Sequence, residues 1–123
     1  MPYRFLAAKE LGDLLRAISH PRRIQILEEL RNGERDVGAL AKALGIPHSG
    51  VSQHLMALRA HRIVSERREG RQVFYRLRAA KLAEWLVEGM DFLPEMDEDV
   101  RQLRKAMTKA KATWSNHGKP TKE

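Results

Sequence analysis

The strongest constraint in the sequence is a break between two short helical patterns within residues 36–62, DVGALAKALGIPHSGVSQHLMALRAHR. Asp36 is a good N-cap for a short helix, and Gly45 is the kind of residue that commonly ends one. After the turn Gly-Ile-Pro, helical spacing resumes from about His48 to about Arg62. Two helices joined by a turn of about three residues with glycine in it form the helix-turn-helix pattern, which we therefore expect here.

The second of these helices has an apolar face and a polar face. Its apolar residues are Val51, Leu55 and Leu58. The residues of the opposite face are Ser49, Ser52, Gln53 and Met56. Short polar groups suit a helix that lies in the major groove of DNA, and the amide of Gln53 can pair with adenine through two hydrogen bonds. His48 and Ser49 lie at the helix N-terminus, where unpaired backbone N–H groups favour a phosphate.

A basic hairpin is predicted directly after this helix. Two β-rich runs, Ile63–Arg67 and Gln72–Leu77, enclose the sequence REGR, which has the glycine of a hairpin turn. Residues 59–78 include seven arginines against two glutamates, so this segment holds most of the formal net charge of +7. The arginines at the hairpin tip are Arg67, Arg68 and Arg71. We expect them to contact a neighbouring DNA backbone or the minor groove, in a winged helix-turn-helix that is mainly α with a two-stranded β-wing.

Helical periodicity continues on both sides of this region. One amphipathic helix carries Phe5, Leu6, Leu11, Leu14, Leu15 and Ile18. The next begins at Pro21, after Ser19 or His20, and ends at Asn32-Gly33. A further helix carries Leu82, Trp85, Leu86, Met90 and Leu93 before Pro94. The last carries a heptad-like seam of Met96, Val100, Leu103, Met107, Ala110 and Trp114.

Three parts of the chain are expected from these patterns. Residues 1–93 form a winged-helix DNA-binding and dimerisation domain, and residues 94–115 form a C-terminal amphipathic helix that packs on the domain or on a partner subunit. Residues 116–123 form a disordered tail.

Three segments, in this order and spacing, carry a resemblance to a known family. They are AISHPRRIQILEEL, DVGALAKALGIPHSGVSQHLMALR and IVSERREGRQVFYRL. In these segments the chain resembles the ArsR–SmtB family of dimeric bacterial winged-helix repressors, and the likeness covers about residues 5–93. The resemblance implies a two-fold homodimer that binds an inverted-repeat operator in double-stranded DNA. The dimer interface that it implies, on the first helix and the later helix before Pro94, contains Phe5, Leu6, Leu82, Trp85, Leu86, Met90 and Leu93.

Many members of this family release DNA when a metal ion binds, but this chain departs from both metal-site patterns. One family site uses cysteines at the start of the first helix of the helix-turn-helix. This chain has Asp36 at the matching position, and its sequence contains no cysteine. The other uses carboxylates and histidines on the dimer helix, where Ala79, Lys81 and Phe92 stand at matching positions and only Glu95 remains. A protonated lysine and a phenylalanine offer no lone pair to a metal. We therefore expect no metal at either inherited site and no other cofactor.

The five histidines show no pair with HxxxH spacing, so a new metal site would need residues that the fold or the dimer brings together. His54, inside VSQHL, is expected to pack or to lie near DNA, and His20 to cap a helix or lie on the surface. His61 ends the long helix, where the helix dipole favours a cation. His48 suits a phosphate contact and a turn surface equally well, and His117 belongs to the tail.

These patterns predict a sequence-specific DNA-binding regulator, a dimeric repressor whose effector is an unknown small molecule or a protein. A hydrolase built on Ser52 and His54 fails, because residues two apart on a helix do not face each other. The N-terminal residues lack the apolar run of a signal peptide or a membrane span, so we expect a cytoplasmic protein without a membrane partner. Two alternatives stay open: a metal-responsive repressor with an unorthodox site of histidines and carboxylates, and a winged-helix module that binds a protein through its last helix.

Overall fold

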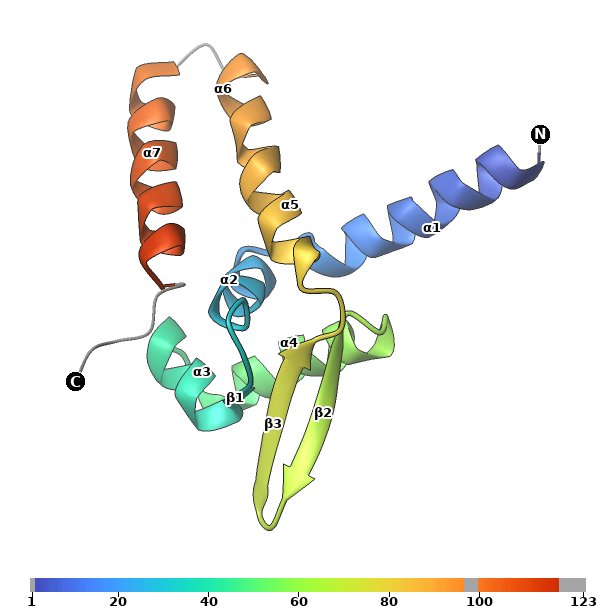
Figure 1. Ribbon diagram of the computed structural model, residues 1–123, viewed down its shortest axis with the longest axis vertical. Helices are drawn as coiled ribbons and strands as arrows, with labels where there is room; N and C mark the ends of the chain where they lie inside the picture. Colours follow the sequence, from blue (N-terminus) through green and yellow to red (C-terminus); the bar gives the residue numbers. More distant parts are fainter. Residues whose placement is uncertain (1, 97–99, 118–123) are drawn as a thin grey trace. The chain divides into compact units, whose positions relative to one another are not determined.

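Helices make up most of the chain, and a small antiparallel sheet interrupts them (Figure 1). The computed structural model describes residues 2–96 and 100–117. The elements are α1 (Pro2–Ile18), α2 (Pro21–Glu29), β1 (Arg35–Asp36), α3 (Val37–Leu44), α4 (His48–Ala60), β2 (Val64–Glu69), β3 (Gln72–Leu77), α5 (Lys81–Gly89), the 3₁₀ helix η1 (Met90–Phe92), α6 (Leu93–Met96) and α7 (Val100–His117). The chain divides into two compact units, Met1–Arg78 with α1 to β3 and Ala79–Glu123 with α5 to α7.

The core of the first unit lies among α2, α3 and α4. Its buried apolar residues are Ala17, Ile18, Ile26, Leu27, Leu30, Leu40, Ala41, Val51, Leu55, Leu58, Ile63 and Val64. Burying one leucine or isoleucine side chain contributes roughly 1.5–3 kcal/mol, so a cluster of this size fixes the place of each helix that joins it. Because α4 supplies three of these residues on one face, its opposite face is held in a defined direction.

The helix-turn-helix predicted from the sequence is confirmed, with Gly45, Ile46 and Pro47 between α3 and α4. The Asp36 carboxylate accepts a hydrogen bond of 2.7 Å from the backbone N–H of Ala39 and so caps α3. Gly45 ends α3 with a φ of 68°, a left-handed conformation that costs glycine little. Local chemistry therefore sets both ends of α3.

The start of α2 is joined to the ends of its neighbours. The Nδ1 of His20 accepts a hydrogen bond of 3.0 Å from the backbone N–H of Arg22, so the capping role expected of His20 is confirmed. Arg23 donates to the carbonyl of Ala17 at 2.9 Å, and Arg22 donates to the carbonyl of Leu44 at 3.3 Å. These two arginines thus satisfy backbone acceptors at the C-terminal ends of α1 and α3.

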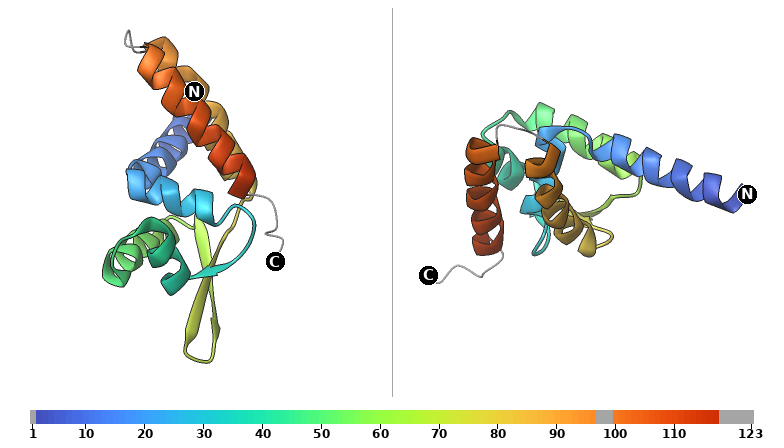
Figure 2. Two further views of the ribbon diagram at one scale, coloured as in Figure 1. Left: turned by 90° about the vertical axis from the view of Figure 1, so that its left-hand side faces the viewer. Right: turned by 90° about the horizontal axis from the view of Figure 1, so that it is seen from above.

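The sheet has three antiparallel strands in the order β1-β3-β2. The predicted hairpin consists of β2 and β3, and Gly70 in its turn has a φ of 62°. This hairpin, the wing, extends beyond the helices of its unit in two perpendicular views (Figures 1 and 2). The sequence did not predict β1, which pairs Arg35 with Tyr75 and Asp36 with Phe74 of β3. The third strand therefore joins the wing to the start of α3.

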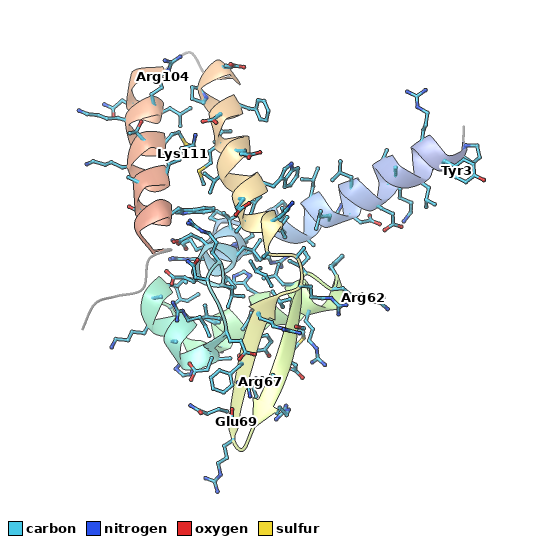
Figure 3. The ribbon with its side chains drawn as sticks, in the orientation of Figure 1. Tyr3, Arg62, Arg67, Glu69, Arg104 and Lys111 are labelled. Carbon is cyan, nitrogen blue, oxygen red and sulfur yellow. The ribbon has the colours of Figure 1, made fainter. Side chains whose placement is uncertain are left out.

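A turn of left-handed backbone connects α4 to β2. Arg62, labelled in Figure 3, has a φ of 58° although it is not a glycine. Its N–H donates to the carbonyl of Arg59 at 2.9 Å, and the N–H of Ile63 donates to the carbonyl of Leu58 at 3.0 Å. This is the hydrogen-bond pattern of a Schellman motif, and its apolar residues Leu58 and Ile63 are both buried. The motif sets the direction in which the wing leaves α4.

In the second unit, α5 is followed by η1 and α6. Pro94 lies in the first turn of α6, where no intrahelical N–H is needed, and so it begins a helix instead of following the end of one. Met96 belongs to α6 and α7 begins at Val100, so the expectation that one helix carries the whole seam is wrong. Helix α7 extends to His117, two residues past the predicted end, and residues 118–123 of the predicted tail lie outside the described residues.

Helix α7 packs along α6, and the Lys111 ammonium group pairs with the Asp91 carboxylate. The described side chains of the seam are half-buried or buried: Leu103, Met107, Ala110 and Trp114.

Among the helices within residues 2–96 and 100–117, none combines the length and the apolar character that crossing a membrane requires.

Candidate nucleic-acid interface

The outward face of α4 is polar and open to solvent. Ser49, Ser52 and Gln53 are exposed, and Met56 on the same face is 70% exposed. On the opposite face the fully buried residues are Val51, Leu55 and Leu58. The two faces predicted from the spacing of these residues are therefore confirmed.

Helix α4 begins without a side-chain cap. Its N-cap residue is Pro47, which makes no side-chain hydrogen bond, and the exposed side chains of His48 and Ser49 follow. The carbonyl of Pro47 accepts from the N–H groups of Gly50 and Val51 at 3.1 and 3.2 Å, as in the first turn of a helix. The N–H groups that precede these two lie at the positive end of the helix, where phosphate groups commonly bind proteins.

His54 differs from the other predicted contact residues because its ring lies against α2. Its Nδ1 accepts a hydrogen bond of 3.2 Å from the Nε of Arg23, and its ring centroid lies 4.4 Å from that of His20. Burial, and then the neighbouring His20 and Arg23 side chains, lower the pKa of His54 below its usual value of 6.5. The observed contacts of His54 are thus a hydrogen bond to Arg23 and a ring contact with His20, both within the protein. A role for His54 in DNA binding stays a prediction.

One face of the wing is joined to α4. Glu66, Arg68 and Tyr75 share this face, since alternate residues of a strand and their cross-strand partners point the same way. Arg59 of α4 pairs with Glu66 at 3.0 Å, and the Tyr75 hydroxyl donates to the Glu66 carboxylate at 3.2 Å. Burial and the adjacent Glu66 charge raise the pKa of Tyr75, so this hydroxyl keeps its proton at neutral pH. These contacts connect α4 and the wing on one side of the unit.

The three arginines predicted for the wing tip do not share one environment. Arg68 and Arg71 are exposed, and neither side chain forms a hydrogen bond or an ion pair with another described residue. Arg67, labelled with Glu69 in Figure 3, is exposed as well, but its guanidinium pairs with Glu34 and Glu69. Carboxylates thus engage every nitrogen of its guanidinium, and a contact of Arg67 with DNA stays a prediction.

Two residues of this region were not predicted. Arg59 fits the exposed side of the α4 pattern, and its ion pair with Glu66 forms only because the turn at Arg62 brings β2 back. Glu34 lies 33 positions before Arg67, so no local pattern links them. No signal in the sequence identified Glu34 as the partner of Arg67.

The residues predicted for a dimer interface leave apolar surface exposed in the single chain. In the first unit, α1 extends away from α2 towards Tyr3, and on it Phe5 is 73% and Leu6 is 53% exposed (Figures 1 and 3). In the second unit, Trp85 is 44% and Leu93 is 43% exposed. The half-buried members of the set are Leu82, Leu86 and Met90.

The carboxylate at the position of one family metal site has other partners. Asp36 caps α3 through Ala39 and also accepts from the Gln72 amide at 3.4 Å. Within residues 2–96 and 100–117, no three histidine, cysteine, aspartate or glutamate side chains gather as metal ligands do.

Comparison with known proteins places the chain in a family. The sequence profile described as "Bacterial regulatory protein, arsR family" matches residues 20–66, which contain α2, α3, α4 and the start of the wing. The biofilm growth-associated repressor of Xylella fastidiosa is 43% identical over 77 residues, which cover 63% of this chain and 68% of that protein. The chain belongs to the ArsR family.

Other ArsR-family proteins match with similar strength. The transcriptional repressor SmtB of Mycobacterium tuberculosis is 43% identical over 79 residues, 64% of this chain, and the match spans 58% of its own length. The solution structure of a homodimeric winged helix-turn-helix DNA-binding domain from Mycobacterium bovis has 31% identity and a TM-score of 0.66, covering 77% of this chain and 91% of that one. The predicted winged-helix fold is thereby confirmed. The family is one of regulatory proteins, and the relatives named here are repressors and not enzymes.

Proposed function

We propose that this ArsR-family protein is a homodimeric transcriptional repressor that binds an inverted-repeat operator in double-stranded DNA. The observation that carries the proposal is the division of α4 into an exposed polar face and a fully buried apolar face. A helix anchored in this way can present its polar face to a partner without losing core packing. The repressor names of the two curated relatives support the regulatory role.

Helix α4 lies in the major groove in this proposal. Gln53 pairs with an adenine through its amide, and Ser52 offers a hydroxyl to a neighbouring base edge. At the helix start, the backbone N–H groups of His48 and Ser49 contact a phosphate, which supplies the cap that Pro47 does not provide. The base contacts specify the sequence, and the phosphate contact fixes the register of the helix on the duplex.

The wing supplies phosphate contacts beside α4. Arg68 and Arg71 have no ion-pair partner among the described residues, so their charges are available to neutralise phosphates and release counterions. The ion pair between Arg59 and Glu66 keeps the wing next to α4 while they do so. Specificity then comes from α4 and much of the affinity from the wing.

A second copy of the chain covers the exposed apolar residues of α1 and of the second unit in this proposal. Phe5 and Leu6 on α1, and Trp85 and Leu93 in the second unit, are the residues that gain most from burial. A two-fold dimer presents two copies of α4, and half-sites about one helical turn apart, roughly 34–36 Å, follow from that symmetry.

The proposed signal for release is a small molecule or a protein, because the residues at the family's metal positions include Lys81 and Phe92, which cannot ligate. A metal signal is the competing explanation. Equilibrium dialysis of the dimer against zinc and nickel checks it, since tight binding of either ion together with loss of operator binding would replace this part of the proposal.

Fluorescence anisotropy tests the proposed function. The probes are DNA from upstream of the protein's own gene and a shuffled duplex of the same composition, each at about 50 and about 200 mM salt. We expect the protein to prefer the upstream DNA strongly at both salt concentrations. Weak binding that is equal on the two duplexes and disappears in the higher salt would overturn the proposal and favour a protein-binding module. Sedimentation velocity of the free protein checks the dimer separately.

A further inference from the structure

Each nitrogen of the Arg67 guanidinium donates a hydrogen bond within the protein. Its Nε and Nη2 donate to the two carboxylate oxygens of Glu34 at 3.0 and 2.9 Å, and its Nη1 donates to Glu69 at 2.7 Å. Its Cζ lies 4.7 Å from the centroid of the Phe74 ring, which covers one side of the guanidinium plane. Every nitrogen of this guanidinium therefore has a carboxylate partner, and the paired fork with Glu34 is the strong bidentate form of this interaction.

These contacts connect the wing to the segment that leads into the helix-turn-helix. Arg67 lies on β2 opposite Phe74 of β3, and Phe74 in turn pairs with Asp36 of β1. Glu34 immediately precedes β1, and Asp36 ends β1 and caps α3. The ion pair between Arg67 and Glu34 thus lies on one face of the sheet. Glu66, which pairs with Arg59 of α4, lies on the opposite face.

The local charge argues against a phosphate at Arg67. Two carboxylates surround one guanidinium, so the group formed by Glu34, Arg67 and Glu69 has a net negative charge. A DNA phosphate at Arg67 would approach the carboxylates of Glu34 and Glu69, whereas Arg68 and Arg71 have no carboxylate partner among the described residues. The Arg67 guanidinium also holds the pKa of the Glu34 carboxyl below its usual value, so the pair is fully charged at neutral pH.

We propose that Arg67 is a positioning residue, which ties the wing to Glu34 and so sets the direction in which Arg68 and Arg71 meet DNA. The proposal rests on the proposed function for its effect on binding, but the tie itself exists without DNA. The tie between Arg67 and Glu34 makes Glu34 necessary for tight binding to DNA, although Glu34 and DNA are both negatively charged. A direct contact of Arg67 with a phosphate predicts the opposite effect of Glu34, because losing that carboxylate would free the arginine.

The test uses four variants of the full-length protein: Arg67→Ala, Glu34→Gln, the charge-swapped pair Glu34→Arg with Arg67→Glu, and Arg76→Ala as the matched control. Arg76 lies on the same wing face and donates to Ser65 instead of to Glu34, so the control removes the same charge without the tie. Anisotropy against the upstream and shuffled duplexes, over a range of salt, measures the affinity for each duplex and its salt dependence.

The expected results separate the two roles. Arg67→Ala and Glu34→Gln each weaken binding to both duplexes at least about threefold, as coupled residues of one network do, without changing the slope of log affinity against log salt. The swapped pair recovers most of the affinity, and Arg76→Ala keeps it. Tighter binding by Glu34→Gln, a shallower salt slope in Arg67→Ala, or a swapped pair weaker than Arg67→Ala would each overturn the positioning role.

A second measurement needs no DNA. Amide ¹⁵N relaxation of the wing turn, residues 68–71, reports how tightly the wing is held. Arg67→Ala should lower the order parameters of these amides, and the swapped pair should restore them. If the wild-type protein shows no preference for the upstream DNA, the proposed function fails, while unchanged order parameters in Arg67→Ala would refute the tie whatever the protein binds.

Discussion

The Nε of Arg23 and the Nδ1 of His54 lie 3.2 Å apart, and the hydrogen bond between them joins α2 to α4. The same guanidinium donates to the carbonyl of Ala17 at the end of α1, at 2.9 Å. One arginine thereby connects three helices of the first unit. His54 accepts this bond only when its Nδ1 has no proton, so the junction requires the neutral imidazole.

Acid should therefore destabilise the protein through His54. Its pKa in the folded state is below the usual 6.5, so an unfolded chain takes up a proton in a range of pH where the folded one resists it. The free energy of unfolding should fall as the pH drops below 6.5 and on through the folded-state pKa. Urea denaturation at a series of pH values measures this, and His54→Asn, which keeps a side-chain acceptor, should reduce the dependence. His61→Asn, which removes an exposed histidine, is the control, and equal pH dependence in all three proteins would contradict the assignment.

Gln53→Ala should relax the sequence preference without weakening nonspecific binding. Loss of a two-bond contact to adenine costs about 1–3 kcal/mol of discrimination at one base pair of each half-site. Competition with operators altered at single positions measures this cost. Gln25→Ala, which removes an exposed glutamine from α2, should leave the preference unchanged. Discrimination by Gln53→Ala that matches the wild type at every position would exclude Gln53 from base recognition.

Arg68→Ala should weaken binding to every duplex by a similar factor, because a phosphate contact carries no sequence information. The slope of log affinity against log salt should become shallower by about one, the effect of one lost phosphate contact. Lys9→Ala removes a positive charge from α1, where Lys9 pairs with Asp13, and serves as the control. A loss confined to one operator sequence would mean that Arg68 reads bases.

Arg62→Gly should stabilise the fold. The backbone at this position has a φ of 58°, and a left-handed conformation costs a residue with a side chain roughly 1–2 kcal/mol that glycine avoids. Part of this gain is offset because glycine also gives the unfolded chain more freedom, so we expect a net increase of about 1 kcal/mol in the free energy of unfolding. Chemical denaturation measures it. Arg62→Ala, which keeps the strain and removes the side chain, shows whether the side chain itself contributes, and a less stable Arg62→Gly would contradict the strain argument.

The helix-turn-helix was predictable because its signals are local. Asp36 caps α3 by accepting from the N–H of Ala39, three residues further on. Gly45 ends the same helix because its own backbone adopts the left-handed conformation. The exposed and buried faces of α4 followed from spacing alone, since a helix fixes which residues share a side. The wing also followed from short-range signals, with Gly70 in the turn between two β-rich runs.

What was missed depends on contacts between distant residues. Strand β1 is two residues long and exists only because Arg35 and Asp36 lie beside β3, so its own sequence has no strand pattern. Arg67 and Arg68 are neighbouring arginines of the predicted wing tip, and the bidentate pair of Arg67 with Glu34 depends on a residue 33 positions away. Pro94 is ambiguous in the sequence because proline suits both the position after a helix and the first turn of the next helix, which is where it lies.

The exposed apolar residues of α1 have a consequence for the lifetime of the protein. A chain without a partner keeps Phe5 and Leu6 in water at the end of a helix that extends from its unit. In the proposed dimer those residues are covered, so association protects this segment from proteolysis. Newly made chains at low concentration would then be degraded faster than chains that have paired. The cellular amount of the repressor would thus determine how long each copy survives, in addition to how often the operator is occupied.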